Sequence, residues 1–421
     1  MSDAPVTQVR IERLGHRGDG VADGVFVPRA LPDEHVEGVI DDGRMEQPRI
    51  LEPSPYRVAA PCTHYRHCGG CALMHASDAF VAEWKQDVVR RALAAQGIEA
   101  TVAHLHVSPP RARRRATLSG RRLKRGPVVG FHARASDMVT DIPECHLLHP
   151  DLIAVLPALE AVTEAGVSRK GEIALTITQS SAGVDVAVAH GKPLDAALRA
   201  TLARILGAHG LARLAWDGEV VAQADAPFQN FGPARVVPPP GAFLQATAQG
   251  EAALLEAVRG ALAGCGRIVD LFSGCGTFAL PLAAQATVHA VEADSAMLEA
   301  LAAGWRQALG LKLVTTERRD LFRDPLVAGE LERFEAAVID PPRAGAEAQI
   351  EQLALAGTPV IAMVSCNPVT FARDARRLVE AGYGMDRLTV VDQFRWSSHV
   401  ELAARFRAGH TASGSNPTRP Q

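Results

Sequence analysis

The sequence lacks long apolar runs, a strong net charge and an N-terminal export signal. No stretch approaches the roughly 18 uninterrupted apolar residues of a membrane span, and the first residues lack the basic and apolar regions of a signal peptide. The net charge of −3 predicts no overall attraction to nucleic acid, so such affinity requires a local patch. These absences predict a cytoplasmic protein that does not bind membranes. No internal repeat or obligatory protein partner is evident, which favours a monomer.

The chain of 421 residues is long enough for about two to three domains. Short strand-like runs predict a small OB-like barrel in residues 1–55, a type that often binds nucleic acid, although a structural β-cap has the same pattern. Three prolines at 238–240 end an expected central domain of strands and helices, 56–240. Helices and strands then alternate through 241–408, which predicts a doubly wound α/β sheet with an antiparallel ending. We expect a disordered tail at 409–421.

Three polar turns follow apolar runs in this last domain. The stretch 365–368, which contains Cys366, follows the run 359–364, Asp340 ends the run 336–340, and a Gly-bearing turn occupies 273–277. Open α/β sheets place their ligands at the carboxyl ends of the strands. The sequence therefore predicts an active site at this edge, and one of its turns carries a thiol.

The turn at 273–277 predicts a site for a nucleoside. It lacks the Gly-Lys-Ser/Thr of a phosphate loop and departs from the G-x-G-x-x-G spacing of dinucleotide sites. Glu292 lies about 20 positions after the glycines, where an acid can bind ribose hydroxyls. Asp320 follows the next strand, where it can bind an adenine edge. The glycine turn, the two acids and Asp340 thus follow successive strands, and this set favours S-adenosylmethionine, a nucleoside without phosphates.

A cysteine cluster predicts a metal site. Cys62, Cys68 and Cys71 lie close together and Cys145 lies far downstream, and reduced thiols grouped in this way indicate metal binding or catalysis rather than disulfides. Four thiolates suit zinc or an iron–sulfur cluster. Three clustered cysteines and one remote cysteine fit a cubane, while His64 or His67 could replace a thiolate at a zinc site.

A basic segment predicts contact with RNA phosphates. Between positions 111 and 125 there are seven arginines, one lysine and no acidic residue. Guanidinium groups pair with phosphates and stack on splayed bases, although a solvated pair of strands would have the same charges. The predicted RNA-binding residues are Arg111, Arg113, Arg114, Arg115, Arg121, Arg122, Lys124 and Arg125.

Residues 241–408 resemble the RNA (uracil-5-)-methyltransferase family, whose members act on ribosomal or transfer RNA. The resemblance is carried by Phe243-Leu-Gln245, the stretch from Asp270 to Phe278, Asp340-Pro-Pro-Arg-Ala-Gly345, Ser365-Cys-Asn-Pro368 and His399-Val-Glu401. Residues 25–34 resemble the family's N-terminal TRAM domain, an OB-like RNA binder. The resemblance therefore covers nearly the whole chain and implies a class I methyltransferase fold for 241–408.

The resemblance also implies a role for each site residue. Cys366 would be the nucleophile and Glu401 the general base, and the four cysteines would hold a 4Fe-4S cluster. Thr277 stands where some members have Asn, so it keeps a hydroxyl but lacks an amide. The implied cofactor contacts are Gln245, Phe272, Thr277, Glu292, Asp320 and Asp340.

The chemistry of uracil also requires a thiol and a base, whatever family the chain resembles. C5 is too weak a nucleophile to take a methyl group until a thiolate adds at C6, and a base must later remove the C5 proton. A helix that begins near Pro368 is expected to favour the thiolate of Cys366. The apolar neighbours of Glu401 are expected to raise its pKa.

The leading hypothesis is therefore S-adenosylmethionine-dependent synthesis of 5-methyluridine in structured RNA. Family analogy favours 23S ribosomal RNA over transfer RNA. A non-catalytic RNA-binding iron–sulfur protein would need neither Cys366 nor Glu401. A base amino-methyltransferase would need an aromatic residue where Arg343 stands, and no thiol.

Overall fold

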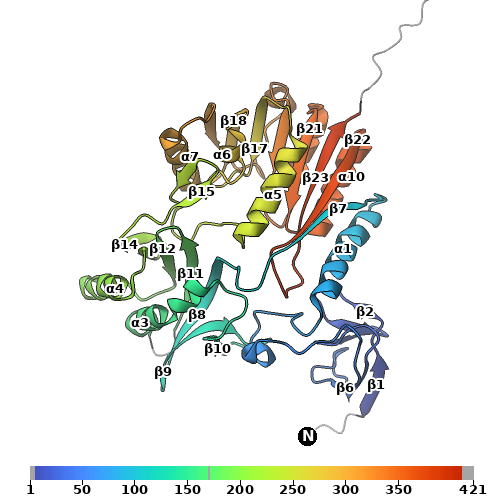
Figure 1. The fold of residues 1–421 in the computed structure, drawn as a ribbon, viewed down its shortest axis with the longest axis vertical. Helices are drawn as coiled ribbons and strands as arrows, with labels where there is room; N and C mark the ends of the chain where they lie inside the picture. Colours follow the sequence, from blue (N-terminus) through green and yellow to red (C-terminus); the bar gives the residue numbers. More distant parts are fainter. Residues whose placement is uncertain (1–4, 169–170, 410–421) are drawn as a thin grey trace, which may run out of the picture.

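The computed structural model describes residues 5–168 and 171–409. Figure 1 shows a large sheet with its helices, a second sheet beside it, and a small N-terminal β unit. In the N-terminal unit, two three-stranded sheets enclose a core that includes Ile11, Val27 and Val36. Their orders are β1-β5-β6 and β2-β3-β4, with bounds β1 Val6–Arg10, β2 Arg13–Leu14, β3 Gly20–Ala22, β4 Val25–Val27, β5 His35–Val39 and β6 Arg49–Glu52.

The central part is a seven-stranded sheet covered by helices. Its order is β10-β9-β8-β11-β12-β13-β14, and α3 packs against both β8 and β9. The strands are β8 Arg115–Leu123, β9 Gly126–His132, β10 Val139–Asp141, β11 Glu172–Ser180, β12 Gly183–Ala189, β13 Arg213–Trp216 and β14 Glu219–Gln223; the helices are α2 Pro150–Ala154, α3 Leu156–Gly166 and α4 Ala196–His209.

The C-terminal part is an eight-stranded sheet in the order β19-β18-β17-β20-β21-β23-β22-β7. The first five strands are parallel, and β23 enters antiparallel between β21 and β22. This confirms the expected doubly wound sheet with an antiparallel ending. The bounds are α5 Ala248–Ala261, β17 Arg267–Leu271, α6 Ala279–Leu282, β18 Thr287–Glu292, α7 Ser295–Gln307, β19 Val314–Arg318, α8 Ala328–Leu331, β20 Ala336–Ile339, α9 Glu347–Leu355, β21 Val360–Ser365, α10 Pro368–Glu380, β22 Tyr383–Asp392 and β23 Glu401–Ala408.

Three segments from outside 241–408 pack with this C-terminal part. Strand β7 (Val102–Val107) pairs in parallel with β22, and helix α1 (Asp78–Ala94) packs on α10. The hairpin of β15 (Gln229–Phe231) and β16 (Ala234–Val236) also packs against α7 and the core around it. The large sheet and its helices thus include segments from the stretch 56–240.

Local side-chain caps set several helix starts, including the one expected near Pro368. Ser77 accepts from the backbone N–H of Phe80 and begins α1, and Thr247 accepts from Gly250 and begins α5. Asn367 caps α10, whose first residue is Pro368. Side chains at these positions satisfy amides that have no partner within the helix.

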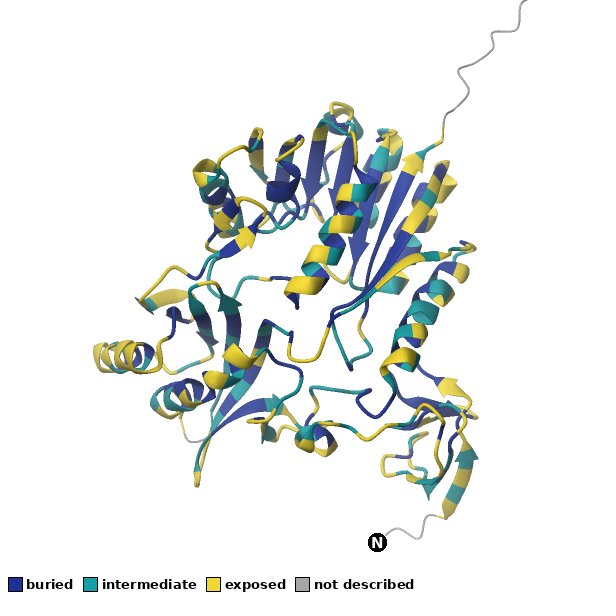
Figure 2. Cartoon of the chain, in the orientation of Figure 1, coloured by how far each residue is buried: buried dark blue, intermediate teal, exposed yellow. Residues whose placement is uncertain are grey.

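Buried strands form the centre of the large sheet (Figure 2). Separate apolar clusters cover its two faces, one around Ile339 and Phe371 and the other around Val338 and Leu254. Within the described residues, no helix is long and apolar enough to cross a membrane. The prediction for 410–421 lies outside the described residues.

Candidate active site

A cavity of about 580 Å³ opens at the carboxyl edge of the large sheet. Strands β17, β18, β20 and β21 are parallel, so the residues that follow them meet at this edge. The structure brings all eight predicted catalytic and cofactor residues together here. The cavity is lined by Gln245, Phe272, Thr277, Glu292, Asp320, Asp340, Cys366 and Glu401, among others.

Strand pairing places the thiol beside the carboxylate. Cys366 follows the last residue of β21, and Glu401 is the first residue of β23. Ser365 pairs with Leu402 across these antiparallel strands. Cys366 follows Ser365 in the sequence, and Glu401 precedes Leu402. Because the two strands are antiparallel, both residues lie on the same side of this pair, at the edge of the sheet. Glu401 is buried, whereas Cys366 is partly exposed to the cavity.

Burial dominates the electrostatics of the site. It raises the pKa of Asp340 to about 7 and raises that of Glu401 well above its usual range, with the charge of Asp340 adding to the second rise. The expected rise at Glu401 is confirmed. Burial, followed by the charges of Glu401 and Asp340, raises the pKa of Cys366 to about 11.

The expectation that the helix start would favour the thiolate is therefore wrong for the free protein. Cys366 lies just before Asn367, the N-cap of α10. The effect of one helix terminus is modest. Here, desolvation and two neighbouring carboxylates outweigh it, so the thiol is protonated near neutral pH in the absence of ligand.

Arg343 opposes these negative charges from the rim of the cavity. Its positive charge lowers the pKa of both Cys366 and Glu401. The guanidinium donates to Nδ1 of His399 at 2.8 Å, and the side chain of Asn367 donates to the Arg343 carbonyl at 2.9 Å. Arg343 is thus held at the site by residues next to both predicted catalytic groups.

Sequence reasoning missed Gln393, which is buried behind Glu401. Its side-chain amide donates to Oε1 of Gln245 at 2.5 Å, and Gln245 donates to Oδ2 of Asp340 at 3.4 Å. Hydrogen bonding by Gln393 also lowers the pKa of Glu401, against the effect of burial. No motif singled out Gln393, because its role depends on contacts distant in sequence.

The glycine turn is held by an acid at the end of the next strand. Glu292 accepts from the backbone N–H groups of Gly274, Ala293 and Asp294, at 3.0, 2.7 and 3.1 Å. Gly276 has φ of +94°, and a Cβ there would come within 2.9 Å of Leu280. The turn therefore requires glycine, and Glu292 fixes its shape while it faces the cavity.

Two features suit this end of the cavity to a cationic nucleoside. Phe272 and Phe322 lie with ring centroids 5.3 Å apart and form an aromatic wall. The hydroxyl of Ser273, a lining residue, is buried without a hydrogen-bond partner in the described chain. Burial of an unpaired polar group is costly, so this hydroxyl fits a ligand that supplies a hydrogen-bond partner.

The four predicted cysteine ligands face one small cavity of their own. Cys62, Cys68, Cys71 and Cys145 all line it. The backbone N–H of Gly70 donates to the sulfur of Cys68, and that of Leu147 donates to the sulfur of Cys145. Within 5–168 and 171–409, no three His, Cys, Asp or Glu side chains form a site for a metal ion.

The basic segment does not form one continuous surface. Arg114 is buried in an ion pair with Glu251, and Arg115 donates to the carbonyls of Gly241 and Ala242 at 2.9 Å. The partly buried Arg113 stacks on the ring of Phe394 at 5.8 Å. Among the other five, Arg121 and Arg122 pair with Glu172 and Glu164, while Arg111, Lys124 and Arg125 are exposed. These contacts leave the exposed members as the better candidates for RNA contact.

Comparison with known proteins agrees with this geometry. Residues 238–406 match the family model described as tRNA (Uracil-5-)-methyltransferase. The chain is 42% identical to an uncharacterized RNA methyltransferase of Mesorhizobium japonicum, over 94% of this chain and 96% of that protein. It is 34% identical to the 23S rRNA (uracil(1939)-C(5))-methyltransferase of Halomonas elongata, over 93% and 87% of the two chains.

A solved structure shares the fold over nearly its full length. The tRNA (uracil-54, C5)-methyltransferase of Pyrococcus abyssi, solved with S-adenosyl-L-homocysteine, superposes with a TM-score of 0.76 at 23% identity, covering 95% of this chain and 99% of the other. The large sheet therefore has the class I methyltransferase fold. With full-length relatives above 30% identity, the chain belongs to the RNA (uracil-5-)-methyltransferase family.

Proposed function

We propose that this protein uses S-adenosylmethionine to methylate C5 of a uridine in structured RNA. The observation that carries the proposal is the shared cavity of Cys366 and Glu401, which supplies the thiol and the carboxylate that the reaction needs. When bound, S-adenosylmethionine supplies the methyl group and a positively charged sulfonium. The aromatic wall, Glu292 and the unpartnered hydroxyl of Ser273 are the features that suit it.

The residues of this chain divide the reaction between them. The Cys366 thiol first loses its proton to solvent, and the resulting thiolate forms a bond to C6 of the uracil ring, which makes C5 electron-rich enough to take the methyl group. Glu401 then accepts the proton from C5, the C6–sulfur bond breaks, and the thiolate is restored. The positive charge of Arg343 favours the anionic forms of both groups. The target base must be flipped out of its stack to enter.

Ribosomal RNA is the favoured substrate. The support is the 34% identical relative that acts on 23S rRNA, which covers almost the whole chain. Transfer RNA is the alternative, since the matching family model is described by that substrate. Mapping of 5-methyluridine in ribosomal and transfer RNA, from cells with and without the gene, tests both. Loss of one 23S site supports the proposal, and loss of a transfer-RNA site alone contradicts the substrate assignment.

We also propose that the four cysteines hold a 4Fe-4S cluster. The four thiolates line one small cavity and would be the ligands of such a cluster. Backbone N–H donors to two of the sulfurs are typical partners of such thiolates. His64 accepts from the backbone of Glu144, and His67 does not line this cavity, which disfavours a zinc site that uses them. Iron and sulfide analysis of anaerobically purified protein tests this, and stoichiometric zinc would contradict it.

A further inference from the structure

Lys85 on helix α1 is completely buried, and the reaction described above does not use it. The side chain is 0% exposed, and its ammonium group lies 2.5 Å from Oδ1 of Asp392, which is 2% exposed. The same ammonium group donates to the backbone carbonyl of Phe394 at 3.0 Å. One buried lysine thus joins helix α1 to the end of strand β22 and to the residue two positions beyond it.

Stability alone does not account for a charged pair in this place. A buried ion pair can be replaced by apolar residues of similar size at little or no cost in stability, because desolvation offsets the attraction of the charges. The other buried side chains on this part of α1, those of Val81, Trp84 and Val89, are apolar, and a methionine at position 85 would continue that surface. What an ammonium group adds is several N–H donors, which can reach acceptors on two different segments.

We call residues 393–400, which connect β22 to β23, the catalytic loop. Both of its ends lie at the active site, because β22 and β23 pair with each other and β23 begins at Glu401. The first residue of the loop, Gln393, is buried and forms a hydrogen bond with Glu401. Near its end, His399 accepts from Arg343 at 2.8 Å. The shape of this loop therefore decides where these groups lie.

The two acceptors of Lys85 flank Gln393 in the sequence. Asp392 precedes it as the last residue of β22, and Phe394 follows it. The Phe394 carbonyl also accepts from the backbone N–H and the hydroxyl of Ser397, at 3.0 and 2.9 Å, which closes the first turn of the catalytic loop. Lys85 thus fixes the chain on both sides of the residue that contacts the predicted base.

One residue of the catalytic loop has an unfavourable backbone conformation. Trp396 has φ of +58°, in the left-handed region that bulky residues rarely occupy. Its carbonyl accepts from the backbone N–H groups of Ala72 and Leu73, at 2.8 and 2.9 Å. A residue keeps such a conformation only where the surrounding structure fixes it. The catalytic loop therefore depends on contacts from other parts of the chain.

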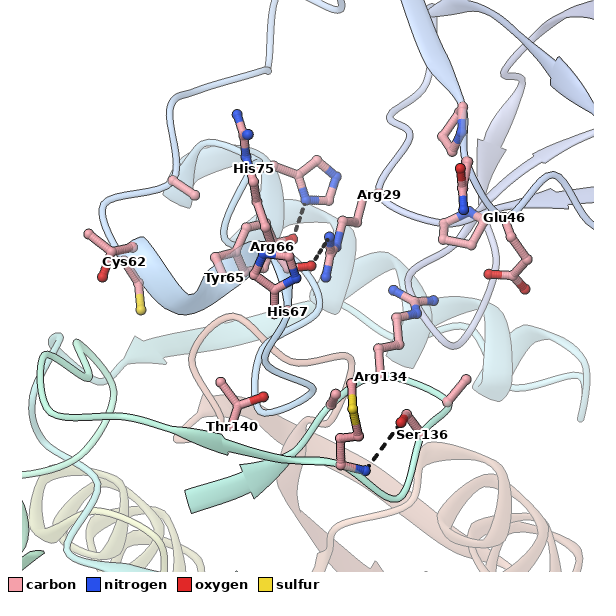
Figure 3. Close-up of a pocket in the computed structure, with 18 of the residues that line it drawn as sticks. Arg29, Glu46, Cys62, Tyr65, Arg66, His67, His75, Arg134, Ser136 and Thr140 are labelled. Carbon is pink, nitrogen blue, oxygen red and sulfur yellow. Dashed lines mark hydrogen bonds between the residues drawn. The ribbon is translucent and has the colours of Figure 1, made fainter. Parts of the chain in front are cut away.

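The segment that holds Trp396 is fixed by side-chain contacts of its own. The hydroxyl of Tyr65 donates to the carbonyl of Ala72 at 2.7 Å and lies 2.6 Å from Nδ1 of His75, and Figure 3 shows the second of these contacts. The rings of Tyr65 and Trp396 also pack in one apolar cluster. This segment thus holds the middle of the catalytic loop, whereas Lys85 holds its start.

We propose that Lys85 is a positioning residue for the methylation reaction, because it fixes the catalytic loop and so places Gln393 beside Glu401. It acts through the loop and not on the substrate. This role rests on the proposed function for the identity of the reaction, and it adds to that function a residue from outside 241–408.

Amide hydrogen exchange, measured by mass spectrometry, tests the anchoring without any RNA. The single variant Lys85→Met leaves Asp392 buried and unpaired, so the test uses Lys85→Met/Asp392→Leu, which removes both charges. The urea midpoint of this double variant should stay near that of the natural protein. Loss of a hydrogen bond from a charged donor should speed amide exchange about tenfold or more in residues 393–400 and at Ala72 and Leu73.

Turnover by the same double variant tests the consequence for the reaction. We expect kcat to fall roughly tenfold to hundredfold, because the base is no longer held in place, while the KM for RNA changes little. Proton removal from C5 should slow more than methyl transfer, so protein covalently joined to unmodified RNA should accumulate on denaturing gels. A loss of stability alone would lower the amount of folded protein without producing this adduct.

Two further variants serve as controls. Lys312→Met removes an exposed lysine that also donates to a backbone carbonyl, that of Gln285 at 2.6 Å, and it should change neither loop exchange nor turnover. Asp392→Asn weakens the ion pair but keeps the lysine donor to Phe394. Amides in residues 393–400 should therefore exchange more slowly in Asp392→Asn than in the double variant.

Unchanged exchange in residues 393–400 of the double variant would overturn the proposed role of Lys85. Faster exchange with full turnover and no adduct would also overturn it, and so would a double variant that does not fold, since the pair would then serve stability. A natural protein that methylates no RNA would contradict the proposed function instead, and the exchange experiment would still decide whether Lys85 holds the loop.

Discussion

The side-chain amide of Gln393 donates to Oε1 of Gln245 at 2.5 Å. Gln393 is also clamped from the other side, because the backbone N–H of Thr247 lies 3.5 Å from its Oε1. That contact orients the amide so that its hydrogens face Gln245 and Glu401. One buried residue thus connects the start of helix α5, the cofactor-side Gln245 and the predicted base.

Replacement of Gln393 by Leu should slow turnover and move its pH dependence. The variant removes the hydrogen bonding that lowers the pKa of Glu401, so the base is deprotonated only at higher pH. A hydrogen bond to a charged group contributes roughly 1.5–3 kcal/mol, which corresponds to a roughly tenfold to hundredfold loss of kcat. The measurement is kcat against pH. This role would be contradicted if kcat were lower but still fell at the same acidic pH as in the natural protein.

Replacement of Glu401 by Gln should stop the reaction after methyl transfer. Without a base, the C5 proton stays and the C6–sulfur bond cannot break, so protein covalently joined to RNA accumulates. Loss of a general base lowers the rate by roughly 10²–10⁴. Denaturing gels with unmodified RNA and S-adenosylmethionine detect the adduct.

Glu299→Gln is the control for this experiment, because Glu299 is an exposed carboxylate on α7. It should leave both rate and adduct level unchanged. Full activity of the Glu401→Gln variant, or inactivity without any adduct, would refute the assigned role.

The buried carboxyl of Asp340 should lower the free energy of unfolding at neutral and alkaline pH. Burial raises its pKa from 3.8 to about 7, so the folded state holds the proton more tightly than the unfolded state. Stability is therefore lost as pH rises from about 4 to about 7 and stays lost above that. A rise of about three units corresponds to at most roughly 4 kcal/mol.

Asp340→Asn should accordingly be more stable than the natural protein at pH 8 and equal to it at pH 4. Urea unfolding at both pH values measures the difference. Asp225→Asn, at an exposed aspartate, should show none. An Asp340→Asn variant that is less stable at pH 8 would contradict the raised pKa.

The sequence predicted the parts of the fold that depend on local patterns. Apolar runs marked the strands, and parallel strand ends brought Asp340 and Cys366 to one edge. The addition of β7 to the large sheet was not predictable, because its partner β22 lies about 280 residues away. The sequence of an edge strand carries no pattern that tells which sheet it will join.

Side-chain pairing over long distances also escaped prediction. Arg114 belongs to a basic run in sequence, yet Glu251 neutralises it in the fold. The pKa of Cys366 depends on Glu401 and Asp340, which approach it only across the sheet. Residue types gave the chemistry, and the fold determined which of those residues are free to act.

The central claim is that the sulfur of Cys366 bonds to the uracil ring during the reaction. Reaction with RNA that carries 5-fluorouridine tests it most directly, since fluorine in place of the C5 proton prevents Glu401 from completing the elimination. We predict a stable adduct whose peptide map places the RNA on Cys366, and no adduct from the Cys366→Ser variant. An adduct on another residue, or one that forms equally in the serine variant, would contradict the account.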